Sequence, residues 1–298
     1  MGISGSDFIM SFPNYLMKNS RKNKISLYLS TPLNRKVDVN ITAPEYKGAY
    51  QINKKLMLTP GTSKEITLTK KFRMPPGTSI SARTLVITAS DLIDVVGSNT
   101  YELRGDAFSA IPDNFLGKEY VAVSYKPIQW TVKNAASFVT ISAGIRATST
   151  RLTITFPPWV NDERVFLNGS WYGAEECAEV WLKSLETLQI QTEHDLTGTF
   201  VSASQSVAVY SGVNRTIVFK KNTKCVGSHL LAQMPPIDRA GLEYVAFDYP
   251  YRENYRGSIY RIIATEVNTR VTLPGRLHVL EKRGQHMKCN KTSNSSAN

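Results

Sequence analysis

The 298-residue chain has few of the side chains from which reactive or metal-binding sites are usually built. It has only three cysteines and four histidines, and the histidines lack the spacing of metal ligands. It contains no HExxH, paired CxxC, P-loop or GxSxG motif and no dinucleotide-binding glycine motif. No loop is dense enough in aspartate to hold calcium. The sequence therefore predicts a protein that is not an enzyme and uses no cofactor or metal.

Long apolar runs are also missing, because none approaches the 18 residues of a membrane-spanning helix. The N-terminus has neither the basic nor the apolar region of a signal peptide. With 42% hydrophobic and 20% charged residues, the chain has the composition of a folded, non-membrane protein.

Positive charge is present and is unevenly distributed. The net charge is +12, of which residues 1–73 carry +9. Such a surface attracts polyanions, among them acidic glycans. Nucleic acid is not expected as a partner, because no nucleic-acid-binding motif accompanies the charge. The candidate polyanion patch consists of Lys18, Arg21, Lys22, Lys24, Lys70, Lys71 and Arg73.

One short motif occurs three times: a glycine, a carboxylate and an apolar run. It reads GSDFIMSF at residues 5–12, GKEYVAVSY at 117–125 and GLEYVAFDY at 241–249. Pro112 and Pro236 each stand five residues before the next glycine. This spacing predicts a unit used twice, over about 5–112 and 117–236, and begun again at 241–284.

Period-two alternation dominates the chain, which predicts β-strands throughout. Residues 195–212 are expected to form a hairpin that turns at 204–206, with a counterpart at 81–99. Residues 174–183 are a candidate short helix. The third copy is expected to contain strands at 244–249, 259–264 and 270–273. The polar tail, 285–298, is expected to be disordered.

The fold class is therefore all-β and repeat-built, with two architectures open. One is a propeller-like array of antiparallel sheets, in which each blade needs neighbours. The other is a pair of tandem seven-stranded β-sandwiches. An incomplete third unit would leave a sheet edge unpaired and open to self-association.

Five Asn-X-Ser/Thr triplets give mild support for secretion. The candidate N-glycosylation sites are Asn40, Asn168, Asn214, Asn290 and Asn294.

Three ordered motifs, DLTGTFVSASQSVAVYSG at 195–212, CVGSHLLAQMPP at 225–236 and YRIIA at 260–264, resemble the N-terminal domain of the IgG Fc-binding protein family. The opening residues 5–13 also resemble the start of that domain. The resemblance covers about residues 5–284. It implies an extracellular, non-enzymatic adhesive module of mucus-associated proteins, and thus a sequence that is incomplete at its N-terminus, where a signal peptide would precede Met1.

The resemblance also implies a disulfide that this sequence alters. The family places one cysteine soon after the Ser-Gly of the first motif, where this chain has Val213, Asn214 and Arg215. Cys225 therefore lacks its usual local partner. The substitute pair to consider is Cys177 with Cys225.

Two functions remain open from the sequence. The first is an extracellular module that recognises a protein or glycoprotein partner in mucus, matrix or innate defence. The second is a structural or polymer-forming repeat with weak polyanionic-glycan binding and no specific ligand. Salt-sensitive retention on heparin or mucin would favour the first.

Overall fold

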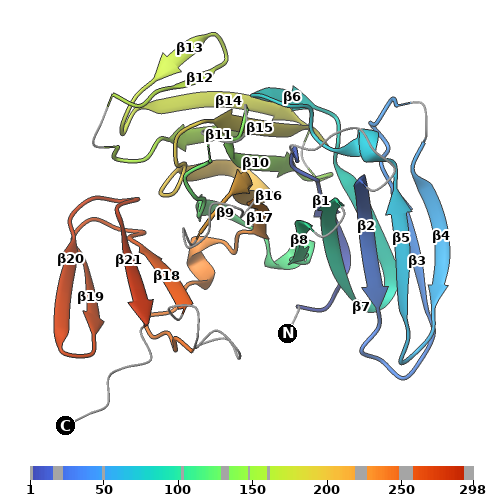
Figure 1. The fold of residues 1–298 in the computed structure, drawn as a ribbon. Helices are drawn as coiled ribbons and strands as arrows, with labels where there is room; N and C mark the ends of the chain where they lie inside the picture. Colours follow the sequence, from blue (N-terminus) through green and yellow to red (C-terminus); the bar gives the residue numbers. More distant parts are fainter. Residues whose placement is uncertain are drawn as a thin grey trace.

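The computed structural model describes residues 3–15, 23–48, 51–101, 104–128, 134–146, 148–159, 162–218, 227–247 and 258–291. These residues form antiparallel strands and three short 3-10 helices, so the prediction of an all-β fold is confirmed. Figure 1 shows a blue-to-cyan unit at the N-terminus, a green-to-yellow unit beside it and an orange-to-red C-terminal unit.

We call these the first unit, the second unit and the C-terminal unit. The first unit contains β1 (Gly5–Met10), β2 (Asn23–Ser30), β3 (Val37–Thr42), β4 (Asn53–Leu58), β5 (Ser63–Leu68), η1 (Lys70–Phe72), β6 (Ser79–Ser81), β7 (Leu85–Tyr101), β8 (Arg104–Ser109) and η2 (Asp113–Phe115). The second unit contains β9 (Gly117–Val121), β10 (Ser137–Ala143), β11 (Ser149–Thr155), β12 (Val165–Leu167), β13 (Ser170–Tyr172), β14 (Cys177–Lys183), β15 (Thr187–Thr192), β16 (Phe200–Thr216), β17 (Ser228–Gln233) and η3 (Ile237–Arg239). The C-terminal unit contains β18 (Ser258–Ile263), β19 (Thr269–Leu273), β20 (Arg276–Leu280) and β21 (His286–Lys291).

One long strand organises each of the first two units. The first half of β7 pairs with β1 and β3, and its second half pairs with β2 and β8. In the second unit, β16 pairs in the same way with β9 and β11, then with β10 and β17. The outer pairs also match, because β3 with β4 and β2 with β5 correspond to β11 with β14 and β10 with β15. The repeat predicted from the sequence is therefore present as one seven-strand pattern used twice.

The seven-strand count is the one that the sandwich alternative predicts, and the propeller-like arrangement of blades is not confirmed. The two units are joined by β6, which leaves the first unit and pairs with β15 at the edge of the second sheet.

The predicted hairpins at 195–212 and 81–99 are wrong, because residues 200–212 and 85–99 each lie in one continuous strand of 17 residues. A two-residue hairpin turn needs positive φ angles, and none occurs at 204–206. Instead β16 contains a bulge. Gly117 of β9 lies opposite Val207 and Glu119 lies opposite Ser202, so a step of two residues in β9 corresponds to a step of five residues in β16. β7 contains the same bulge, because Gly5 lies opposite Ile93 and Asp7 lies opposite Thr88. The polar residues 204–206 are exposed on this bulge, which bends the strand without reversing it.

The candidate helix at 174–183 is also a wrong prediction. Residues Cys177–Lys183 form β14, in which exposed and buried residues alternate strictly. Ala178, Val180 and Leu182 point into the second core, and this period of two cannot build one face of a helix.

The C-terminal region departs from expectation at two places. The strand expected at 244–249 is not formed at residues 244–247, and residues 248 and 249 lie outside the described residues. The expected strands at 259–264 and 270–273 are present as β18 and β19. Disorder from residue 285 is wrong for His286–Lys291, which form β21 because the neighbouring β18 supplies backbone partners for all six residues. Residues 292–298 lie outside the described part of the chain.

Glycine and proline of the repeated motif touch across each unit. A side chain at Gly5 would place its Cβ 2.4 Å from Pro112, and one at Gly117 would place it 2.5 Å from Pro236. The proline at the end of each unit therefore packs directly on the strand that opens the unit. This contact explains why the two residues recur together in the sequence.

The first two units share a buried polar interface around His229. Its Nδ1 lies 2.9 Å from the carbonyl oxygen of Val213 and its Nε2 lies 3.4 Å from the Asn99 amide nitrogen. Its ring stacks on Tyr15, with ring centroids 4.4 Å apart. Burial lowers the pKa of His229 to about 3, and Arg73 nearby acts in the same direction. The imidazole is therefore neutral in the folded protein.

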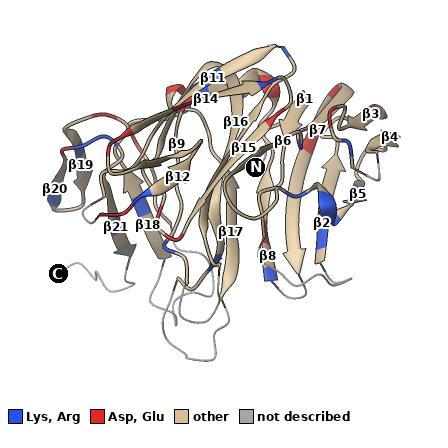
Figure 2. Cartoon of the chain, turned by 90° about the horizontal axis from the view of Figure 1, so that it is seen from above, with Lys and Arg blue, Asp and Glu red and all other residues tan. Residues whose placement is uncertain are grey.

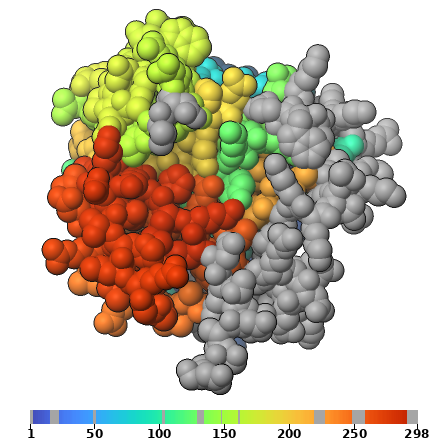
Figure 3. Space-filling model, turned by 60° about the vertical axis from the view of Figure 1, so that its left-hand side comes forward, coloured from blue at the N-terminus to red at the C-terminus, as the bar shows by residue number. Residues whose placement is uncertain are grey.

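The C-terminal unit docks on the second unit through a backbone contact between two glycines and through side chains that include Arg261 and Arg283. Gly198 and Gly284 lie back to back, since a Cβ at Gly198 would lie 2.1 Å from the Gly284 carbonyl oxygen. Arg261 of β18 donates to the carbonyl of Ser124 and to the Asp195 carboxylate, both at 2.9 Å. Its guanidinium carbon lies 4.3 Å from the centre of the Tyr125 ring. Figure 3 shows the red C-terminal unit packed against the yellow-green second unit.

Protonation of His229 should make the protein less stable in acid. The pKa of His229 is lower in the folded protein than in the unfolded chain, so the unfolded chain takes up the proton first as the pH falls. The contribution of His229 to the free energy of unfolding is therefore fully present above about pH 6.5 and is lost as the pH falls towards 3. The free energy of unfolding should be about 2 kcal/mol lower at pH 5 than at pH 7. Urea unfolding at the two pH values measures this difference. His229→Gln should remove most of it, leaving the smaller contribution of His286, whose pKa burial also lowers. An unchanged pH dependence in this variant would contradict the assignment.

Gly198→Ala should loosen the C-terminal unit, because the added methyl group collides with the backbone of Gly284. The matched control is Gly169→Ala, since Gly169 also has a positive φ but has open space around its Cβ position. Both variants bear a strain of about 1 kcal/mol, and only Gly198→Ala adds the collision. Limited proteolysis should release the C-terminal unit sooner from Gly198→Ala than from the control. Equal cleavage rates would contradict this docking mode.

Candidate functional site

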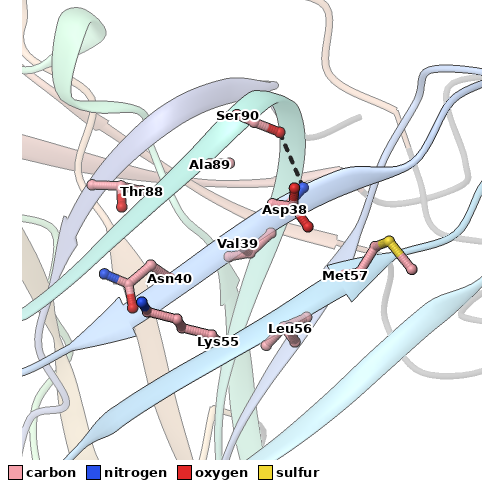
Figure 4. Close-up of a pocket in the computed structure, with 9 residues that line it drawn as sticks. All are labelled: Asp38, Val39, Asn40, Lys55, Leu56, Met57, Thr88, Ala89 and Ser90. Atoms are coloured by element: carbon pink, nitrogen blue, oxygen red, sulfur yellow. Dashed lines mark hydrogen bonds between the residues drawn. The ribbon is translucent and has the colours of Figure 1, made fainter.

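The outer face of the first unit carries a hollow of about 480 Å³ across three neighbouring strands (Figure 4). It is lined by Asp38, Val39, Asn40, Lys55, Leu56, Met57, Thr88, Ala89 and Ser90. The backbone N–H of Asp38 donates to Ser90 Oγ at 3.0 Å, which ties β3 to the bulge of β7. The hollow contains hydroxyl, amide and charged groups but no histidine or cysteine. This set suits hydrogen bonding to a ligand better than nucleophilic chemistry.

Elsewhere in the described ranges His194 lies near a carboxylate, with its Nδ1 3.6 Å from Glu163 Oε1. These ranges contain no cluster of three or more His, Cys, Asp or Glu that could hold a metal ion. Asp106 has a raised pKa because it is buried, yet its carboxylate accepts from the backbone N–H of Leu231 at 2.9 Å and serves to join the units. Within the described residues there is also no helix with the length and apolar character needed to cross a membrane.

The candidate polyanion patch is only partly a surface. Lys24 and Lys71 are exposed, and Lys70 is half-buried, on the neighbouring elements β2 and η1. Lys18, Arg21 and Lys22 lie outside the described residues. Figure 2 shows Lys and Arg interspersed with Asp and Glu over both units.

Arg73 is a wrong prediction as a member of this patch. Its side chain is buried, with Nε donating to Asn99 Oδ1 and Nη2 donating to the carbonyl of Lys24 at 2.6 Å. Burial lowers the pKa of Arg73 to about 10. The guanidinium is thus used to bind strands together and cannot reach a ligand. Its position in one short basic segment with the half-buried Lys70 and the exposed Lys71 gave no signal of this difference.

The candidate glycosylation sites also separate by burial. Asn168 is exposed in the tight turn between β12 and β13, where a glycan would meet no obstacle. Asn40 is half-buried at the hollow. Asn290 lies in β21 opposite Ile259, and Asn294 lies outside the described residues.

Asn214 is a wrong prediction as a glycosylation site, because only 1% of it is exposed. Its Oδ1 accepts from the Ala136 N–H at 2.7 Å and its Nδ2 donates to the Asn134 carbonyl at 3.3 Å. The side-chain amide thus provides hydrogen-bond partners for the backbone of the residues just before β10. The Asn-Arg-Thr triplet in this place is therefore a packing feature.

Cys177 has an exposed, free thiol at the start of β14, 3.2 Å from Thr155 Oγ1. Its candidate partner, Cys225, lies outside the described residues. A free Cys177 gives the proposed pair no support.

Three aromatic side chains of the second unit are exposed rather than packed. Phe166 and Trp171 cross the β12–β13 hairpin with ring centroids 5.3 Å apart, and Trp181 lies on the edge strand β14. Trp171 and Trp181 are 63% and 59% exposed. Trp159, by contrast, stacks on Phe156 and donates from Nε1 to the Asp195 carbonyl at 2.8 Å. Large exposed aromatics of this kind commonly contact partners.

Loss of the Asn214 amide should destabilise the protein without removing a glycan. Asn214→Ala leaves the buried Ala136 N–H without its acceptor, which should lower the free energy of unfolding by about 1–3 kcal/mol. After expression through a secretory pathway, the glycan mass of this variant should equal that of the wild type. Asn168→Gln is the control, and should lose a glycan with little change in stability. A glycan found on Asn214 would contradict its buried position.

Comparison with known proteins places the chain in a family. The IgGFc binding protein family model matches residues 106–297, which begin in β8 and include the whole second unit and the C-terminal unit. The IgGFc-binding protein of Homo sapiens is 28% identical over 193 residues, which are 65% of this chain and 3% of the human protein. No solved structure matches the chain. Because the family model matches more than half of the chain, the chain belongs to the IgGFc binding protein family.

Proposed function

We propose that this chain is a non-enzymatic, extracellular binding module that recognises a protein or glycoprotein partner. The family match over residues 106–297 is the observation that carries the proposal, because the family is one of binding proteins. The human relative is named for binding IgG Fc, and this chain covers only 3% of it, so we do not extend that partner to this chain.

The distribution of polar groups supports a role for the outer surface. The buried side chains of His229 and Arg73 and the half-buried side chain of Asp106 are occupied by contacts that hold strands and units together. The exposed aromatics Phe166, Trp171 and Trp181 have no such task within the described residues. Aromatic side chains of this type supply much of the binding energy in protein interfaces. Exposure of Asn168 in its turn supports glycosylation and hence secretion.

Trp171→Ala and Trp181→Ala should weaken binding of a glycoprotein partner without unfolding the module. Biosensor measurements on immobilised protein, with purified mucin and with IgG Fc as separate analytes, test this. At least one analyte should bind, and the pair of substitutions should weaken binding at least about ten-fold. Leu92→Ala, an exposed apolar residue of the first unit that does not line the hollow, is the control. Absence of binding to every mucin and serum glycoprotein tried would reject the proposed role.

Weak polyanionic-glycan binding is a second candidate, favoured by the exposed Lys24 and Lys71 on adjoining elements. Mucus and matrix glycans would then add a salt-sensitive attraction to protein recognition. Self-association through an unpaired sheet edge stays a further prediction from the incomplete third repeat.

Replacing Lys70 and Lys71 by Gln should lower the salt concentration at which the protein leaves a heparin column, because two positive charges are removed from one side of the first unit. Lys183→Gln, on the exposed face of β14, is the control and should elute close to the wild type. Elution of the double variant at the wild-type salt concentration would reject a glycan role for these lysines.

A further inference from the structure

The third copy of the repeated motif does not form the paired strand that the other two copies form. In the first copy Phe8 lies opposite Ile87 of β7, and in the second Tyr120 lies opposite Val201 of β16. The third copy has Tyr244 at the same place, four residues into the motif. No described strand pairs with residues 241–245.

Burial of this aromatic position records the difference. Phe8 and Tyr120 are 1% and 0% exposed, whereas Tyr244 is 77% exposed. Val245, the next residue, is 89% exposed. A large aromatic ring that is fully covered in two copies is therefore open to solvent in the third.

The segment nevertheless shares one hydrogen bond with its paired counterpart. In the second unit the Gly117 N–H donates to the Tyr120 hydroxyl at 2.8 Å, and that hydroxyl donates to the Val207 carbonyl at 2.7 Å. In the third copy the Gly241 N–H donates to the Tyr244 hydroxyl at 3.1 Å. The donor of this arrangement is thus present at Tyr244, and the carbonyl that would accept from it belongs to a strand that the described third copy does not contain.

We propose that residues 241–245 bind an extended strand of another polypeptide, added antiparallel as β16 is added to β9. The inference rests on the proposed protein-binding function and names a surface and a class of partner for it. Strand addition of this kind combines backbone hydrogen bonds with pockets for alternate side chains.

The internal copies define the chemistry of the partner strand. Ile87 and Val201 show that a β-branched residue faces the aromatic ring. A small hydroxyl residue follows each of them along the chain, Thr88 in β7 and Ser202 in β16. Beyond the bulge, an apolar residue lies opposite the glycine of the motif, Ile93 in β7 and Val207 in β16. We therefore expect a partner segment with a β-branched residue, then a hydroxyl residue, then a second β-branched residue beyond a polar bulge.

A fluorescent peptide with the sequence of residues 199–208, TFVSASQSVA, is the probe, used with the full chain. Anisotropy should report saturable binding, and a peptide with Val201→Pro should not bind because it loses a strand N–H. Tyr244→Ala should weaken binding at least about ten-fold, whereas Tyr244→Phe should retain most of it, as Phe8 serves in the first copy.

Leu242→Ala is the matched control on the same segment. Leu242 is fully exposed and corresponds to Lys118, which stays exposed in the paired copy, so binding should change less than about two-fold. Because Tyr244 and Leu242 are both exposed, neither substitution should alter the thermal unfolding midpoint. Binding that is absent, or that Tyr244→Ala leaves intact, would overturn the inference. Self-association that Tyr244→Ala abolishes, without peptide binding, would assign the surface to a second copy and would also overturn it. No mucin or IgG is used, so its failure is distinguishable from failure of the proposed function.

Discussion

The whole fold depends on hydrogen bonding along two long, bent strands. Each of β7 and β16 pairs with four other strands, two on each half, so that two half-sheets share one backbone. The bulge between the halves turns the strand and lets both half-sheets cover one core. Close approach at the second half requires Gly212, because a Cβ there would lie 1.9 Å from the Leu230 carbonyl oxygen. Each other strand of the seven-strand pattern pairs with this strand or with one of its direct neighbours.

Several polar residues that could otherwise bind a ligand or catalyse a reaction instead form contacts between the first and second units. His229, Asn99 and Arg73 form one buried set between strands of both units, and Tyr210 of the second unit packs its ring on Phe108 of the first, 5.2 Å away. Groups buried in this way have satisfied partners and little access to solvent. The side chains that remain accessible to a partner include those of the hollow in the first unit, the exposed aromatics of the second unit and Tyr244 in the third copy of the motif.

Some features of the fold and of the candidate sites could be predicted from the sequence, and others could not. The spacing of glycine and proline predicted the repeat correctly because both residues are fixed by a direct contact, Gly5 on Pro112 and Gly117 on Pro236. Burial could not be predicted in the same way. Arg73 stands in one short basic segment with the exposed Lys71, and Asn214 stands in an acceptor triplet, yet both side chains bond to backbone that is distant in sequence. Those partners are known only once the strands are placed.

Alternation of apolar and polar residues by itself determined that the chain is built from strands, because a period of two matches only an extended backbone, and the recurring motif determined that one unit is used again. Tertiary structure alone decided that residues 200–216 continue as one strand through a polar bulge, since the pairing with β9 resumes at Val207 beyond the bulge and β10 pairs from there onward. It also decided which copy of the motif is covered. Phe8, Tyr120 and Tyr244 are alike in sequence, and only the presence of a neighbouring strand separates a core residue from a surface one.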